Sequence, residues 1–286
     1  MKNPKTVLIA CVLSAVIAFG VTTIGSPSLQ GKTEQSVYDR VMQKREIRCG
    51  FVNYPPLLTK DPNTGAFSGI GVDIMTRVAD MLNVKLVWAQ ESSWAGYIED
   101  LNANRFDVLC NLDFFLPFDV GRVDRSDPLF YTSVGIYKRA DDPRFPEGFR
   151  AFNDPNITIS GIDGALSLII QHSDYPLAKT ISGPQTMDYS LIMQNVVNKK
   201  ADVVFIENST ANSFMKANPG KLVNIAKKTP LRVFPYFIPF KLGEDKLRVT
   251  FNGIITYLHE NGEIDKILAK HESGTKDFFR LARSYQ

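Results

Sequence analysis

Residues 46–74 follow the pattern of a strand, a proline-interrupted loop and a helix, and this order restricts the folds open to the chain. The apolar strand 47–52 stops at the Pro55–Pro56 pair, because proline removes a backbone donor and disfavours helical geometry in the residue before it. Such units build open α/β sheets, whose ligands bind at the carboxyl ends of strands. The loop at Tyr54 is therefore a candidate wall of a small-molecule site, with an ordinary strand-to-helix connection as the alternative. Apolar residues then recur on one face of the expected helix: Ile74, Met75, Val78, Met81 and Leu82.

The composition is typical of a globular chain that is long enough for two modest domains. The chain has 286 residues, of which 44% are hydrophobic and 22% charged. The net charge of +3 is small and the basic residues are scattered, so no nucleic-acid partner is expected. The three histidines are far apart, and no Cys/His spacing is typical of a zinc or haem site. No cofactor or metal is therefore expected.

The amino terminus predicts export. Lys2 and Lys5 precede an uncharged apolar run that ends near residue 25. Residues 1–25 are interpreted as a signal peptide or an uncleaved membrane anchor, because the run is at the short limit for a membrane span. Residues 26–36 are polar and predict a flexible tether. Both interpretations place the rest of the chain in the periplasm, either free or tethered to the outer face of the cytoplasmic membrane.

Two motifs, YPPL at residues 54–57 and GIGVD at 69–73, resemble those of the extracellular solute-binding proteins of family 3. These proteins are the polar amino acid receptors of bacterial ABC importers, and the similarity extends to about residue 271. It implies a two-lobed α/β fold, the periplasmic-binding-protein fold of type II, with two hinge crossings. Each lobe is then a mixed, mostly parallel sheet flanked by helices. The expected parts are lobe 1 at 37–133 and 235–273, lobe 2 at 134–234, and an extra helical tail at 274–286.

Cys49 lies on the first strand and Cys110 on the strand expected at 107–112. The resemblance implies that these two strands are neighbours in one parallel sheet. Export allows a disulfide between them. Directly paired strands rarely offer disulfide geometry, so a pair of buried thiols is an equal alternative.

The resemblance implies that lobe 1 contributes several ligand contacts. Trp94 stands where the family places an aromatic ring against its ligand, although a tryptophan that seals a helix end has the same pattern. The loop that follows departs from the family: it carries Asn111 and Asp113, and Asp119 takes the position of the arginine that binds the ligand's carboxylate. Arg122, one helical turn further, reaches the site only if the loop is rebuilt, and a solvated charge cluster is its alternative. Asp119 favours a basic ligand.

Lobe 2 contributes the start of a helix and one carboxylate. Gly164 matches the family's glycine before a helix whose backbone amides bind the ligand's carboxylate, while Ala165 replaces the first hydroxyl residue. Helix capping by Asp163 is the simpler interpretation of this turn. Glu207 holds the position of the carboxylate that pairs with the ligand's ammonium group, with a helix-capping acid as its alternative.

These residues predict a monomeric, non-enzymatic receptor that binds a small polar solute, amino acid-like and favoured to be cationic, for the permease of an ABC importer. A second hypothesis is a periplasmic dehydratase-like enzyme on the same fold, with Asp113, Asp119 and Glu207 as the candidate acids. A third is a membrane-tethered sensor that binds a protein partner and has lost the solute site.

Overall fold

The computed structural model describes residues 35–114, 116, 119–272 and 277–282. Its described helices and strands belong to one compact unit, Ser36–Gln286. The predicted signal peptide or anchor lies outside the described residues, as does the tether except for residues 35 and 36. Within the described ranges, no helix combines the length and the apolar character needed to cross a membrane.

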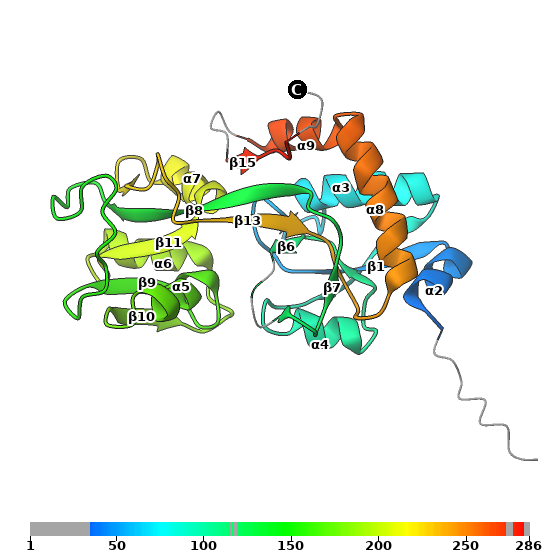
Figure 1. Ribbon diagram of the computed structural model, residues 1–286, viewed down its shortest axis with the longest axis horizontal. Helices are drawn as coiled ribbons and strands as arrows, with labels where there is room; N and C mark the ends of the chain where they lie inside the picture. Colours follow the sequence, from blue (N-terminus) through cyan, green and yellow to red (C-terminus); the bar gives the residue numbers. More distant parts are fainter. Residues whose placement is uncertain (1–34, 115, 117–118, 273–276, 283–286) are drawn as a thin grey trace, which may run out of the picture. The chain divides into compact units, whose positions relative to one another are not determined.

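One sheet forms the centre of lobe 1 (Figure 1). Its strands lie in the order β4-β1-β5-β14-β7, with β1 parallel to β4 and β5 and with β14 antiparallel to β5 and β7. Because β14 comes from the returning part of the chain, this sheet is completed only after the chain has passed through lobe 2. The bounds are Glu46–Phe51 for β1, Lys85–Glu91 for β4, Val108–Leu109 for β5, Asp124–Arg125 for β7 and Pro239–Phe240 for β14.

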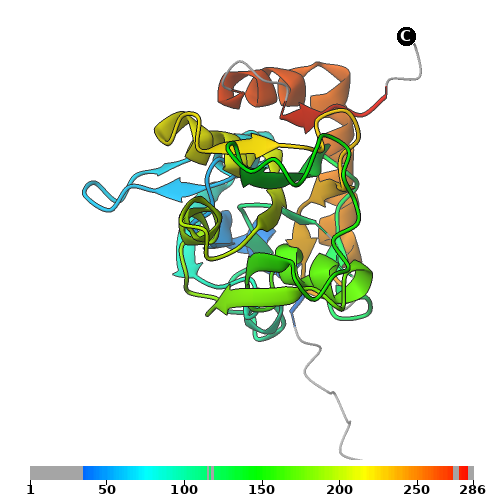
Figure 2. The ribbon, with the colours of Figure 1, turned by 90° about the vertical axis from the view of Figure 1, so that its left-hand side faces the viewer.

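The helices of lobe 1 bury their apolar faces on this sheet and on one another. Of the residues predicted to face inward on α3, Ile74, Met75 and Val78 are fully buried. Met81 is 46% exposed, so its predicted inward position is wrong: it lies at the margin of the apolar stripe in the last helical turn. The bounds are Val37–Lys44 for α2, Ile70–Leu82 for α3, Tyr97–Asn102 for α4, Asp245–Glu260 for α8 and Glu263–His271 for α9. The hairpin of β2 (Thr59–Lys60) and β3 (Phe67–Ser68) extends away from these elements (Figure 2).

A second sheet has the order β10-β9-β11-β8-β13-β6, and β12 and β15 also pair with β8. On its helix α6, Ile192, Met193 and Val196 are buried, whereas Leu191 is exposed. Leu191 directly precedes Ile192 and therefore points to another side of the helix. The strand bounds are Asp113–Phe114 for β6, Phe130–Arg139 for β8, Thr158–Ile162 for β9, Lys179–Gly183 for β10, Val203–Glu207 for β11, Leu222–Asn224 for β12 and Arg232–Phe237 for β13. The helices are α5 (Leu166–Asp174), α6 (Tyr189–Val197) and α7 (Asn208–Ala217).

Two long antiparallel strands, β8 and β13, carry the chain between the lobes (Figure 1). Their register pairs Arg232 with Val134 and Tyr236 with Phe130. Near one end of β13, β6 pairs with Tyr236 and Phe237, so the loop expected to carry ligand residues is attached to the hinge. Two crossings of this kind permit hinge motion between lobes.

The described part of the tail is a strand, which corrects the predicted helix. β15 (Phe278–Phe279) pairs antiparallel with Tyr131 and Thr132 of β8. Phe278 is buried with its ring 5.1 Å from that of Phe130, whereas Phe279 is exposed. This alternation of inward and outward side chains has the period of a strand.

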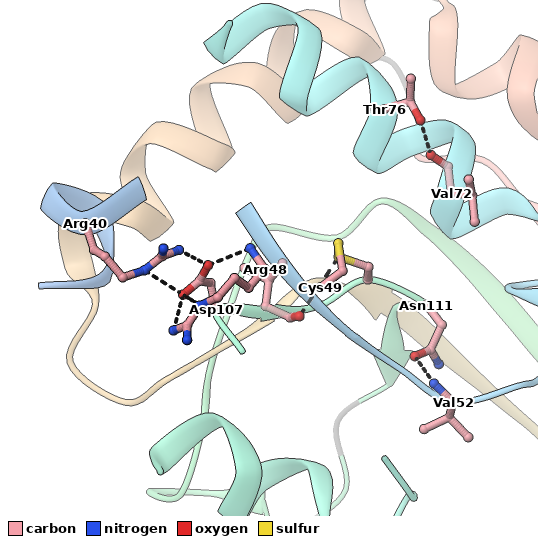
Figure 3. The surroundings of a disulfide bond; sticks show 10 residues. Arg40, Arg48, Cys49, Val52, Val72, Thr76, Asp107 and Asn111 are labelled. Atoms are coloured by element: carbon pink, nitrogen blue, oxygen red, sulfur yellow. Dashed lines mark hydrogen bonds and ion pairs between the residues drawn. A yellow bond between two sulfur atoms is a disulfide. The ribbon is translucent and has the colours of Figure 1, made fainter. Parts of the chain in front are cut away.

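Cys49 and Cys110 form a disulfide, the first of the two alternatives that the sequence left open (Figure 3). The register pairs Cys49 with Val108, so Cys110 lies two positions further along the neighbouring strand path. The two cysteines are therefore not directly opposite each other. Their Cα atoms are 5.4 Å apart, within the range that a disulfide spans.

Candidate functional site

A buried cavity of about 50 Å³ lies between residues of lobe 1 and residues of lobe 2. A second, larger cleft of about 740 Å³ adjoins it, and Tyr54, Trp94 and Tyr189 line both spaces. The cavity is lined from lobe 1 by Tyr54, Trp94, Tyr97, Asp113, Phe114, Leu116 and Asp119, and from lobe 2 by Gly164, Ala165, Leu166, Ser167, Tyr189, Ile192, Phe205, Ile206 and Glu207.

The Tyr54 hydroxyl joins the two lobes. It donates a hydrogen bond to Glu207 Oε2 at 2.8 Å and accepts one from Thr210 Oγ1 at 3.1 Å. The backbone of Tyr54 is held by two hydrogen bonds with Leu58, at 2.8 and 3.0 Å, which fix the loop after β1. Burial raises the pKa of the Tyr54 hydroxyl, with the Glu207 charge as a further cause, so the hydroxyl stays protonated and donates.

Three rings separate the cavity from the cleft, and we call Tyr54, Trp94 and Tyr189 the aromatic wall. The Tyr54 ring packs edge-on against Trp94, with centroids 5.5 Å apart, and against Tyr189 at 4.7 Å. Trp94 and Tyr54 come from lobe 1 and Tyr189 begins α6 of lobe 2. Access from the cleft to the cavity therefore depends on aromatic side chains of both lobes.

Three carboxyl groups line the cavity, and we call Asp113, Asp119 and Glu207 the cavity carboxyls. All are buried. Burial raises the pKa of Asp113 to about 8 and also raises the pKa values of Asp119 and Glu207. None of the described lining residues is Lys, Arg or His. No cationic side chain of the described lining therefore balances the cavity carboxyls, and their charge is neutralised by bound protons or by a bound cation.

Backbone and side-chain donors orient two of these carboxyls. Asp113 accepts the Phe114 amide at 2.8 Å and the Tyr97 hydroxyl. Asp119 Oδ2 accepts the Leu116 amide at 2.8 Å, and Asp119 Oδ1 is buried with no partner among the described residues. Among the described residues, no group of three or more His, Cys, Asp or Glu side chains is arranged to hold a metal ion.

Seven of the nine predicted site residues meet at the cavity, and two do not: Asn111 and Arg122 are corrections. Asn111 Oδ1 accepts the Val52 amide at 3.0 Å and holds the loop after β1 (Figure 3). Arg122 is half-exposed and paired with Glu99 on the surface. Its backbone amide donates to the Asp119 carbonyl at 3.0 Å, and its positive charge lowers the pKa of Asp119 against the larger effect of burial, although Arg122 is not among the described lining residues.

The helix starts of lobe 2 also differ from their simpler interpretations. The N-cap of α5 is Ala165 and no side chain caps it, so capping by Asp163 is wrong. Gly164 has a φ of +74°, a backbone conformation that favours glycine. The Ala165 amide donates a hydrogen bond to the Ile162 carbonyl at 3.0 Å. Glu207 is the N-cap of α7 by position, but its side chain makes no capping bond and turns to Tyr54 instead.

The sequence pattern gave no role to Tyr97, Tyr189 and Thr210. Tyr97 lies three residues after Trp94 at the start of α4, and this helical spacing is a signal that both face one space. Tyr189 and Thr210 have no local motif. Their contacts with Tyr54 join residues that are far apart in the chain, so only the tertiary structure identifies them.

Comparisons with known proteins agree with this architecture. The family model of the bacterial extracellular solute-binding proteins, family 3, matches residues 47–274. The L-cystine-binding protein TcyA of Bacillus subtilis is 24% identical over 220 residues, 76% of this chain and 77% of that protein. A probable amino-acid ABC transporter-binding protein of Haemophilus influenzae is 23% identical over 239 residues, 81% of this chain and 86% of that protein. The crystal structure of an ancestral amino acid-binding protein, a precursor of cyclohexadienyl dehydratase, has a TM-score of 0.73 at 24% identity, with 83% of this chain and 99% of that chain covered. The structural likeness confirms the predicted two-lobed fold.

Proposed function

The chain belongs to the bacterial extracellular solute-binding proteins of family 3, and we propose that it captures a small polar solute with a cationic group between its lobes. The observation that carries this proposal is the 2.8 Å hydrogen bond from the Tyr54 hydroxyl to Glu207, which joins the lobes at a cavity lined by carboxyls. A solute held there touches both lobes at once. It therefore stabilises the arrangement in which the lobes meet, and shifts the population toward that arrangement.

The cavity carboxyls supply the affinity for positive charge. Burial alone makes their ionised forms costly, which is the cause of their raised pKa values. A cation between them replaces the missing counter-charge and favours ionisation. Cation binding and proton release are then coupled, as in other sites where a ligand competes with protons.

The proposed partner is an ABC permease in the cytoplasmic membrane, which receives the solute from the periplasm. The relatives named above include a probable amino-acid ABC transporter-binding protein, which supports this partner class. A permease that recognises the lobes in contact distinguishes loaded from unloaded receptor, because loading changes their relative population.

A second candidate function rests on Asp113. A buried carboxylic acid whose pKa is about 8 is protonated at neutral pH and can act as a general acid in an elimination reaction. This enzyme hypothesis differs from the receptor hypothesis in requiring turnover. Incubation of the protein with a prephenate-like compound, followed by product analysis, tests it, and product formation that is lost in Asp113→Asn would support it.

Thermal denaturation of the purified full chain, in mild detergent, tests the receptor proposal. The panel contains amino acids, amines and organic anions. A solute that binds only the folded state adds about 2.7 kcal/mol when it is present at a hundred times its dissociation constant. We expect stabilisation by one chemical class and its loss in Glu207→Gln. Glu99→Gln is the control, since Glu99 lies on the surface and pairs with Arg122. An unchanged melting temperature with every member of the panel contradicts the proposal.

A further inference from the structure

The cavity is unsuited to a carboxylate ligand. Its described lining contains three carboxyl groups and no cationic side chain. Arg122, the nearby cation in sequence, pairs with Glu99 at the surface. A buried carboxylate needs a hydrogen-bonded counter-charge, whereas the described lining offers it carboxyl groups, which repel it whenever they are ionised.

The start of α5 does not supply that counter-charge. Its amides carry only the partial positive charge of a helix end. The Ala165 amide already bonds to the Ile162 carbonyl at 3.0 Å, and the Ser167 hydroxyl bonds to the Ser160 carbonyl at 2.7 Å.

Two buried polar atoms specify the hydrogen bonding of the ligand. Asp119 Oδ1 is an acceptor without a partner among the described residues, so it calls for a donor on the ligand. Trp94 Nε1 is a buried donor without a described partner, and it calls for an acceptor on the ligand or a water. Ammonium and guanidinium groups provide the N–H donors that Asp119 lacks, whereas a quaternary ammonium provides none.

The aromatic wall adds a second attraction for cations. The faces of tyrosine and tryptophan rings carry negative electrostatic potential, and Tyr54, Trp94 and Tyr189 border the same cavity as the cavity carboxyls. The rings and the carboxyl groups together surround the cavity with negative electrostatic potential. Such a cage discriminates by charge: it favours a cation and disfavours a zwitterion that brings its own carboxylate.

We propose that the ligand is an organic cation with N–H donors and without a carboxylate, a primary amine or guanidine of the kind left when a basic amino acid is decarboxylated. Its cationic group lies between Glu207 and Asp119 and against the aromatic wall. This inference rests on the proposed receptor function and narrows its ligand class.

Calorimetric titration with matched pairs tests the inference. Cadaverine and lysine, and agmatine and arginine, differ within each pair only by the α-carboxylate. We expect each amine that binds to do so at least tenfold more tightly than its amino acid, and choline to bind more weakly than either amine. Tighter binding of the amino acids, or of organic anions, overturns the inference but leaves a solute receptor in place. If no amine, amino acid or anion binds, the receptor function itself fails.

Two substitutions at one position make the test sharper. Asp119→Asn keeps the shape and removes the charge, so we expect amine affinity to fall at least tenfold. Asp119→Arg puts a cation into the cavity, and we expect the preference within each pair to shift toward the amino acid. Glu99→Gln is the matched control and should leave both affinities within twofold. An Asp119→Asn protein that melts normally and binds agmatine as the unchanged chain does contradicts the inference.

Discussion

Two sets of buried carboxyl groups in this protein differ in their counter-charges. Asp142 is 4% exposed, and its Oδ2 lies 2.9 Å from Arg139 and 2.6 Å from Arg144. Hydrogen bonds from Arg144 lower the pKa of Asp142 to about 2. Asp113, at the cavity, is 6% exposed, and burial raises its pKa to about 8. The directions differ because hydrogen bonds from guanidinium groups outweigh burial at Asp142, whereas burial is the largest cause at Asp113.

Asp107, like Asp142, is a buried carboxylate that pairs with arginine side chains, and we call these two residues the paired carboxylates (Figure 3). Its side chain is fully buried, its Oδ1 lies 2.9 Å from Arg48, and Arg40 contacts its Oδ2. These contacts tie α2 and β1 to the residue just before β5. The chain thus supplies arginine where a buried carboxylate holds elements together. The cavity carboxyls receive no such partner from the described lining, which marks them as groups for a ligand rather than for the fold.

The largest expected effect on stability comes from removing the charge of a paired carboxylate. Asp107→Asn leaves Arg40 and Arg48 facing a neutral amide, so we expect the free energy of unfolding to fall by about 3–5 kcal/mol. Urea denaturation measures this change. Asp39→Asn is the control, because Asp39 forms an exposed pair with Lys246 whose loss should change stability much less. Equal effects of the two substitutions would remove the distinction between structural and surface pairs.

The cavity carboxyls, which have no arginine partner in the described lining, predict that the stability of the fold depends on pH. The pKa of Asp113 is about 8 in the folded chain and its ordinary value is 3.8, so the folded state binds the extra proton between these values. Stability from this group is then fully present below about pH 4, falls as pH rises between these two values, and stops falling above about pH 8. Tyr97, Asp119 and Glu207 face Asp113. Asp142 has the opposite sign, since its contribution is lost as pH falls through about 2.

Urea denaturation at several pH values between 5 and 9 checks this dependence. Asp113→Asn should flatten the curve, because the amide does not titrate. Some slope should remain, since burial also raises the pKa values of Asp119 and Glu207. A substituted protein whose slope equals that of the original chain would assign the pH dependence to other groups.

A smaller effect is expected where the two lobes meet. Tyr54→Phe removes the hydroxyl that donates to Glu207 and accepts from Thr210. We expect a loss of about 1–2 kcal/mol in the free energy of unfolding, the usual cost of a buried hydrogen bond to a charged or polar group. Tyr257→Phe, at an exposed tyrosine, is the control. No loss in Tyr54→Phe would mean that water replaces the hydroxyl without cost.

The smallest effect is expected at Arg122. Its pair with Glu99 is exposed on both sides, so Arg122→Gln should change stability by less than about 0.5 kcal/mol. Ligand affinity should stay within twofold, because the guanidinium pairs with Glu99 and Arg122 is not among the described lining residues of the cavity. A tenfold loss of affinity would show that Arg122 contributes to ligand binding. It would also weaken the contrast between the carboxylates that pair with arginine and the cavity carboxyls.

Local pattern sufficed for much of the fold. Of the residues predicted to share the inner face of the first helix, Ile74, Met75 and Val78 are buried in α3. The errors are also local: Met81 was assigned to that face although it is exposed, and the tail was assigned to a helix although it pairs with β8. Pairing of that kind depends on a strand edge elsewhere in the chain, which no local period encodes.

The sequence by itself determined the family, the lobe architecture and the presence of aspartate at position 119, because side-chain periods and motif order are local properties of the chain. Only the tertiary structure decided which groups meet. The disulfide depends on strand register, the contact between Tyr54 and Glu207 joins residues 153 positions apart, and the exclusion of Arg122 depends on a single turn. Contacts of this kind follow from register and from the two crossings of the chain, so their chemistry exists only once the lobes are assembled.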